Sequence, residues 1–242
     1  MMAESTNRQK LRVLTSRITK DLLKFVRGEA LGAFELDADD WDHIIPADRF
    51  VRGALLGPYS WDLTIDPAGG FIPDADVEEL VVSIALENVP GAEINVKGGD
   101  QAASTGEEGI DVIVQMGGPL SRRDLGFLQR EIMNSVAHEL EHKTQKSIFK
   151  APGRGESYYS GLTGASEGSS AFQYLMKPDE IAAHVIGYAA NSRSMRELED
   201  EIADFLAGWQ KKGRISNAEV DQVFDTWTEW ARRNLKQKRF RA

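Results

Sequence analysis

The sequence predicts an α+β fold in which one helix and a small sheet are followed by several more helices. Apolar residues recur at helical spacing in residues 8–30, and three short β-branched segments separated by turn residues follow between positions 81 and 115. From position 119 onward the apolar spacing is again helical. We therefore expect a helix and sheet in residues 1–118, a helical part in residues 119–242, and one compact unit built from both.

The first half of the chain contains the expected sheet. The first helix is predicted from an apolar face, whose members are Leu11, Leu14, Ile18, Leu22 and Phe25. Residues 35–75 are rich in Asp, Gly and Pro and are expected to be mostly loop, with short strands near Trp61–Ile65. Strands are predicted at Val81–Leu86, Glu93–Lys97 and Ile110–Gln115.

A long helix is predicted after Pro119. Ser121 with Asp124 three residues later resembles a capping box, and the helix is expected to end near Ser147. Five apolar residues form one stripe along it. They are Leu125, Leu128, Ile132, Val136 and Leu140.

The rest of the chain contains a loop and three expected helices. Residues 151–170 are rich in Gly and Ser, so we expect a mobile segment that acts either as a lid or as a plain connector. Pro178 is placed to begin a helix, since proline is favoured at the first helical position. Another helix is expected at Arg196–Gln210, and Ser216 with Glu219 predicts a capped start for the last one.

Composition limits the chemistry that is available. The chain of 242 residues has no cysteine and four histidines, so a zinc ion would have to be held by His, Asp or Glu. A net charge of -9 argues against nucleic acid as a partner. No segment is apolar enough to span a membrane, and the N-terminus lacks a signal-peptide pattern, so a cytoplasmic protein is expected. The oligomeric state is left open.

The segment His138-Glu139-Leu140-Glu141-His142 lies on the long predicted helix. Residues four apart share one helix face, so His138 and His142 can direct two imidazoles at one metal ion. Glu139 lies about 100° around the helix from His138, where its carboxylate can reach a water molecule without being a ligand. This is the physical content of His-Glu-x-x-His as a zinc motif.

A catalytic zinc ion usually takes a third protein ligand and leaves one position for water. Glu180, on the helix predicted to begin at Pro178, is the favoured candidate. His184 lies one turn further on the same face and is the alternative ligand. If Glu180 is the ligand, His184 is instead a candidate for stabilising the oxyanion, together with Tyr158, Tyr159 and Tyr188.

Two side chains beside the motif could orient an imidazole through a hydrogen bond, namely Asn134 and Glu141. For Glu141 we favour the simpler interpretation of a solvated charge on the helix.

The motif together with Glu180-Ile181-Ala182-Ala183 resembles the gluzincin pattern of zincin metallopeptidases, in which the third ligand is a Glu on a later helix. The neighbouring residues 174–184 are also similar to uncharacterised proteins described as metallopeptidases, several of them phage-encoded. The resemblance covers about residues 110–190. A virus-encoded protein of this kind would be found in the host cytoplasm or in the virion.

This resemblance implies a zincin-like fold and roles for particular residues. His138, His142 and Glu180 would bind Zn²⁺, and Glu139 would be the general base in the hydrolysis of a peptide or protein substrate. In zincins a strand before the active-site helix commonly pairs with extended substrate. That strand would here be Ile110–Gln115, with substrate-binding residues Ile110, Val112 and Val114.

Two alternatives to a peptidase are considered. One is a non-catalytic, virion-associated or scaffold-associated binding protein that keeps a zincin fold. The retained Glu139 argues against it, since a structural zinc ion needs no general base. The other is a zinc hydrolase that acts on a non-peptide amide.

Overall fold

The computed structural model describes residues 2–32, 51–60, 79–88, 93–101, 108–116, 122–149 and 167–235. The described chain is a mixture of helices and strands. It divides into two compact units, Met1–Leu140 and Glu141–Ala242, which are described here one at a time. The division falls within a continuous helix. None of the described helices is long and apolar enough to cross a membrane.

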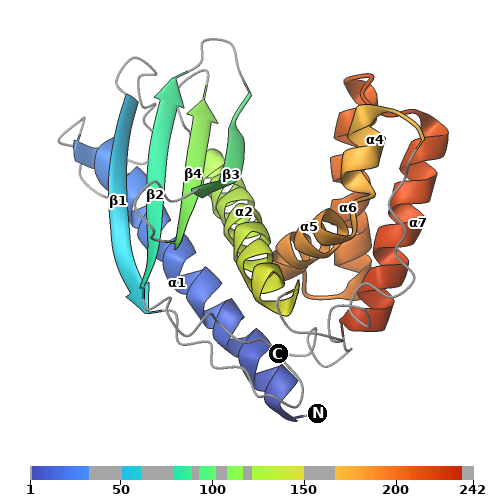
Figure 1. Cartoon of the computed structure of the whole chain (residues 1–242). Coiled ribbons are helices and arrows are strands. Elements are labelled where there is room, and N and C mark those ends of the chain that lie inside the picture. The colour runs from blue at the N-terminus through green and yellow to red at the C-terminus, as the bar shows by residue number, and fades with distance from the viewer. Residues whose placement is uncertain are drawn as a thin grey trace. The chain divides into compact units, whose positions relative to one another are not determined.

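The first unit contains a four-stranded sheet (Figure 1). Its strands are β1 (Val51–Ser60), β2 (Glu79–Asn88), β3 (Asn95–Gln101) and β4 (Glu108–Met116), in the order β1-β2-β4-β3. The central strands β2 and β4 are parallel, whereas both outer pairings are antiparallel. The three strands predicted between residues 81 and 115 are confirmed.

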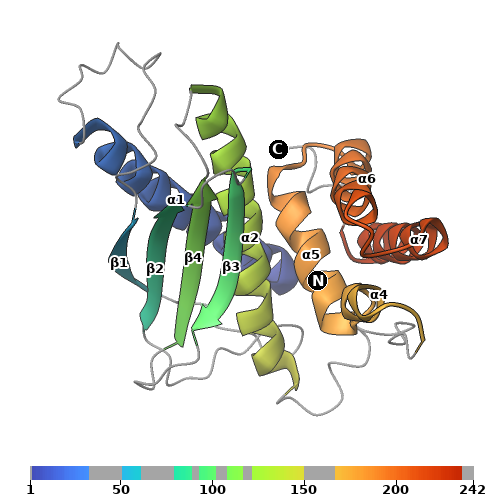
Figure 2. The same ribbon diagram turned by 90° about the horizontal axis from the view of Figure 1, so that it is seen from above.

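Helices α1 (Met2–Gly32) and α2 (Arg122–Phe149) lie along one face of this sheet (Figure 2). Every second residue of β2 and β4 is buried, as expected for strands with one face against a core. The core includes the whole predicted stripe of α2 and two of the five residues of the predicted face of α1, with the other three partly buried against it, which supports both helix predictions. Its buried residues on the helices are Ile18, Leu22, Leu23, Val26, Leu125, Leu128, Ile132, Val136 and Leu140.

Strand β1 was not predicted, because its segment belongs to the Asp-, Gly- and Pro-rich stretch that was expected to be loop. Its pairing with β2 is irregular between Leu56 and Tyr59, where Gly57 and Pro58 lie. Proline within a sheet is confined mainly to outer strands and bulges, and β1 is an outer strand of the described sheet. The strands expected near Trp61–Ile65 lie outside the described residues.

The described residues 167–235 of the second unit are mainly helical (Figure 1). Its helices are α4 (Ser170–Leu175), α5 (Pro178–Asn191), α6 (Met195–Lys211) and α7 (Asn217–Asn234). The predictions for α5, α6 and α7 are confirmed, whereas α4 was not expected. The helices share a second apolar core, in which the fully buried Trp227 donates a hydrogen bond of 3.0 Å to the carbonyl oxygen of Leu175.

Local signals in the sequence account for where these helices begin. Pro178 occupies the first turn of α5, and the Ser194 side chain caps α6. The capping box predicted from Ser216 and Glu219 is present at the start of α7. The predicted box at Ser121 lies outside the described residues.

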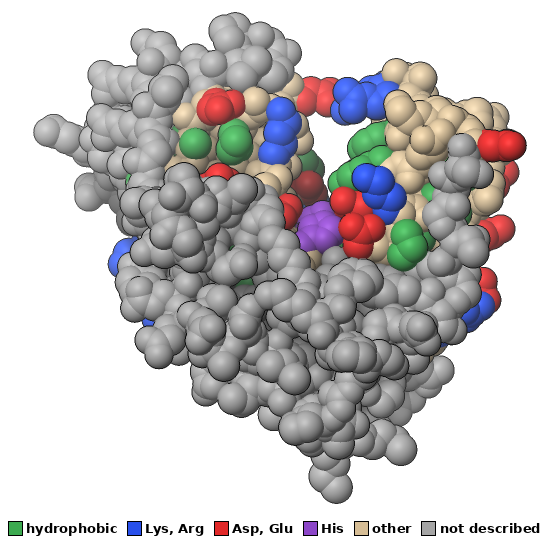
Figure 3. Space-filling model, viewed as in Figure 1, with side chains coloured by type: hydrophobic (Ala, Val, Ile, Leu, Met, Phe, Trp, Pro, Cys, Tyr) green, Lys and Arg blue, Asp and Glu red, His purple; other side chains and the backbone are tan. Residues whose placement is uncertain are grey.

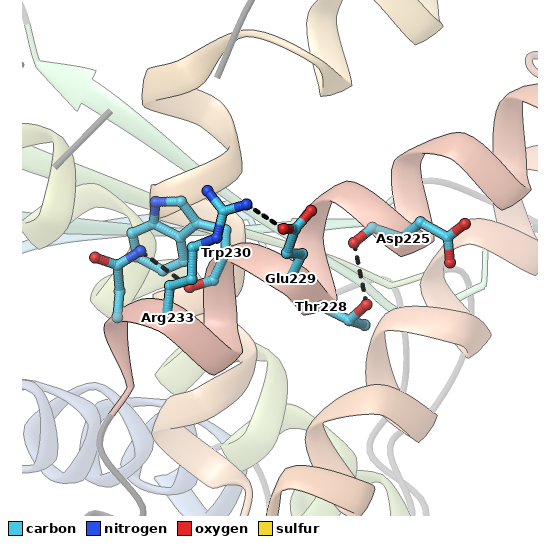
Figure 4. Close-up of polar contacts among 6 residues, drawn as sticks. Asp225, Thr228, Glu229, Trp230 and Arg233 are labelled. Carbon is cyan, nitrogen blue, oxygen red and sulfur yellow. Dashed lines mark hydrogen bonds and ion pairs between the residues drawn. The ribbon is translucent and has the colours of Figure 1, made fainter. Parts of the chain in front are cut away.

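Local polar contacts continue along α7 (Figure 4). Arg233 forms an ion pair with Glu229 one turn earlier, and the Thr228 hydroxyl donates to the carbonyl oxygen of Asp225 at 3.2 Å. Such exposed pairs contribute little to stability individually. The second apolar core and the helix caps are therefore the main contributors to the stability of this unit.

Glu219 also connects two helices. Its carboxylate accepts hydrogen bonds from the backbone N–H groups of Ser216, at 2.7 Å, and of Ser169, which caps α4, at 2.8 Å. These bonds, first that of Ser216 and then that of Ser169, lower the pKa of Glu219 from 4.5 to about 2. The carboxylate therefore accepts protons less readily in the folded chain than in the unfolded one.

We expect Glu219→Gln to destabilise the protein in a pH-dependent way. Because the folded-state pKa is depressed, the contribution of the carboxylate is complete above pH 4.5 and is lost as the pH falls through about 2. Urea unfolding of the wild type and of Glu219→Gln across this pH range should show a lower midpoint concentration for the variant. This difference in midpoint should disappear toward low pH. Asp221→Asn removes one charge from an exposed position of α7 and is the control. A gap independent of pH would contradict the assigned role of the charge.

Candidate metal site

Helix α2 holds the complete motif in one unbroken helical segment. His138 and His142 are therefore one turn apart on the same face, away from the apolar stripe, and both are partly exposed. Glu139 is buried, with 7% of its surface exposed. Glu141 is only 2% exposed, so the expectation of a solvated charge at this position was wrong.

Glu180 lies in the first turn of α5, directly after the Pro178-Asp179 start of that helix. A carboxylate is favoured there by the helix dipole. Its Oε2 atom lies 3.5 Å from Nε2 of His142 and 3.9 Å from Nε2 of His184. The second unit thus brings together one motif histidine and both residues considered for the third ligand.

His184 is surrounded by aromatic rings from four helices of the second unit. Its ring stacks on Trp227 at 4.9 Å between centroids and contacts Phe205 at 5.3 Å, Tyr174 at 6.0 Å and Tyr188 at 6.5 Å. Burial, and then repulsion from His142, lower the pKa of His184 to about 3. Its imidazole is therefore neutral near neutral pH, which is the form that can bind a metal ion.

The donor set suits a zinc ion. Each of His138, Glu180 and His184 could offer one ligand atom to a metal, and His142 lies within 3.5 Å of Glu180. Imidazole nitrogen and carboxylate oxygen are the ligands that zinc accepts in proteins without thiolates. There are thus four candidate ligands, whereas a catalytic zinc ion usually takes three protein ligands.

The side chain of Glu139 lies against strand β3 within the first unit. A Cβ atom added to Gly98 would lie 2.7 Å from Oε1 of Glu139, 2.9 Å from its Cγ and 3.2 Å from its Cδ. Contacts that short do not occur, so the carboxylate uses space that only glycine leaves free. Sequence reasoning missed this residue. The Gly98-Gly99 pair lies just after the predicted strand Glu93–Lys97, and in the structure β3 continues through it to Gln101. Glycine within a strand often marks a close approach, so a longer strand prediction could have pointed to Gly98.

The strand that was expected to bind substrate needs a correction. Ile110, Val112 and Val114 are fully buried in the core of the first unit. Strand β4 is also paired on both sides, with β2 and with β3. It offers no free backbone edge to a peptide, and the side chains of Ile110, Val112 and Val114 are not accessible to one, so the prediction that these three residues bind substrate was wrong. The outer strands of the described sheet are β1 and β3.

The remaining predicted residues have different outcomes. Tyr158 and Tyr159 lie outside the described residues, as does most of the 151–170 segment. Tyr188 stacks with His184 and packs against Phe205, which fits a packing role. Asn134 is buried at 9% exposure, one turn before His138. On the face of the molecule in Figure 3, a histidine side chain is visible at the surface.

Comparison with known proteins gives no match, since no family model, curated protein or solved structure is significantly similar to this chain. The zincin resemblance therefore stays a prediction based on the motif and on Glu180.

Proposed function

We propose that this protein is a zinc-dependent peptidase, with zinc held by His138, His142 and Glu180. The observation that supports this most is the 3.5 Å separation of Glu180 and His142, on helices whose residues are far apart in the sequence. Helix α2 adds His138 one turn before His142. The ligand set is then two imidazoles and one carboxylate, which is a usual set for catalytic zinc.

The chain's own residues would divide the chemistry between them. A bound zinc ion supplies a Lewis acid and makes water a nucleophile near neutral pH. Glu139 accepts a proton from the attacking water and passes it to the leaving amine. Glu139 is buried on α2, between His138 and His142 in the sequence, and its proposed role does not require it to be a ligand. His184 either stabilises the oxyanion or serves as a ligand.

The test of this function is a peptide library incubated with zinc-loaded protein and with protein stripped by a chelator, read by mass spectrometry. We expect cuts only with the zinc-loaded sample, restored when zinc is added back. A panel of non-peptide amides is tested in parallel. Cleavage of these amides without cleavage of peptides would favour the alternative of a zinc hydrolase that acts on a non-peptide amide. Cleavage that persists without metal would overturn the proposal.

One observation favours the non-catalytic alternative as a second candidate. His184 Nε2 lies 3.9 Å from Glu180 Oε2, and its imidazole is neutral, so four protein ligands are available. A zinc ion closed off by four protein ligands is typical of structural sites. A zinc-loaded protein that cuts neither peptides nor amides, with His184 on the metal, would support this candidate.

A further inference from the structure

Strand β3 directs alternate residues at helix α2. Ile94, just before the strand, and Val96 within it pack against the core that α1, α2 and the sheet share. Side chains two apart in a strand point to the same face. Gly98 is therefore the next residue on the helix-facing side, and it is there that the side chain of Glu139 lies.

Glycine is required at this position by space rather than by backbone conformation. Gly98 pairs regularly with Val112 of β4, and its backbone is not in the left-handed region. Alanine would fit the strand itself, yet its methyl group would collide with Oε1 and Cγ of Glu139. Gly99 faces the other way, and a methyl group added there would meet nothing within 4 Å.

We infer that Gly98 is a positioning residue, whose missing side chain lets the carboxylate of Glu139 rest against β3. This inference rests on the proposed function for its catalytic meaning, although the contact itself does not. A larger residue at position 98 would push the carboxylate off β3 and away from the place where it meets the attacking water. The three atoms nearest to a methyl group added at position 98 all belong to Glu139, which is not one of the proposed ligands.

The two glycines give a matched pair of variants. Gly98→Ala and Gly99→Ala make the same change in neighbouring residues of β3, so any effect of stiffening the strand is shared. Crystal structures of both variants test the contact without reference to activity. We expect the Glu139 carboxylate to be displaced in Gly98→Ala and to keep its place in Gly99→Ala. An unmoved carboxylate in Gly98→Ala would overturn the inference.

Kinetics then test the role of the contact. We expect kcat of Gly98→Ala to be about 100-fold below that of Gly99→Ala, because misplacing a catalytic group by about 1 Å can cost this much. KM and zinc affinity should differ little between the two variants, which separates positioning from general damage. Equal kcat values despite a displaced carboxylate would overturn the role. Absence of turnover in the wild type would instead refute the proposed function and leave the structural comparison decisive.

A folding failure of Gly98→Ala is also informative. The double variant Gly98→Ala with Glu139→Ala removes the obstructing side chain and should fold, as judged by its thermal melt. A double variant that is as unfolded as the single one would show that the collision is not with Glu139, and would overturn the inference.

Discussion

Glu139→Gln is expected to remove nearly all turnover while leaving the zinc content unchanged. The amide cannot accept a proton from water, and a general base typically contributes about 10²–10⁴-fold to the rate. The side chain is otherwise the same size, so its buried place against Gly98 is kept. The measurement is kcat on the best library peptide, with zinc per chain determined by mass spectrometry of the metal.

Glu131→Gln is the control for this prediction, since it removes a carboxylate from the same helix two turns earlier. It should keep both zinc and turnover. If Glu139→Gln lost zinc together with activity, Glu139 would be a structural residue. If kcat were unchanged, Glu139 would not be the general base.

Glu180→Ala has the second large expected effect, which is on metal affinity. Losing a directly bound carboxylate should weaken zinc binding more than about 100-fold, because even partners that only orient a ligand are worth 10–100-fold. His184→Ala should weaken zinc binding less than Glu180→Ala does if the imidazole of His184 lies beside the metal without binding it. Competition with a chromogenic chelator measures both affinities.

Asp179→Ala is the matched control, since Asp179 is the neighbouring acid in the first turn of α5. It should leave zinc affinity within a few-fold of the wild type. Unchanged affinity in Glu180→Ala, with a large loss in His184→Ala, would move the third-ligand assignment to His184.

Much of the fold follows from local signals. The stripe of α2, the first-turn proline of α5 and the capping box of α7 each depend on residues close in sequence, and each was predictable. The place of β4 in the sheet was not, because pairing order depends on contacts distant in sequence. Strand β4 is an inner strand because it pairs with both β2 and β3, whereas its alternating buried residues Ile110, Val112 and Val114 would be equally compatible with an edge strand that has one buried face.

The candidate site was predictable to a similar extent. Helical spacing places His138 and His142 on one face, and the resemblance pointed to Glu180, which the structure has beside His142. The aromatic rings around His184 come from four different helices, so no local sequence pattern could predict these contacts. The contact of Gly98 with Glu139 likewise depends on how β3 packs on α2.

We propose that zinc is bound by His138, His142 and Glu180, with one coordination position left for water. Anomalous diffraction at the zinc absorption edge, from crystals of the zinc-loaded protein, tests it most directly. We expect one strong peak with those three side chains as its protein ligands and a solvent molecule in the fourth position. A peak enclosed by four protein ligands, or no peak near α2, would contradict it.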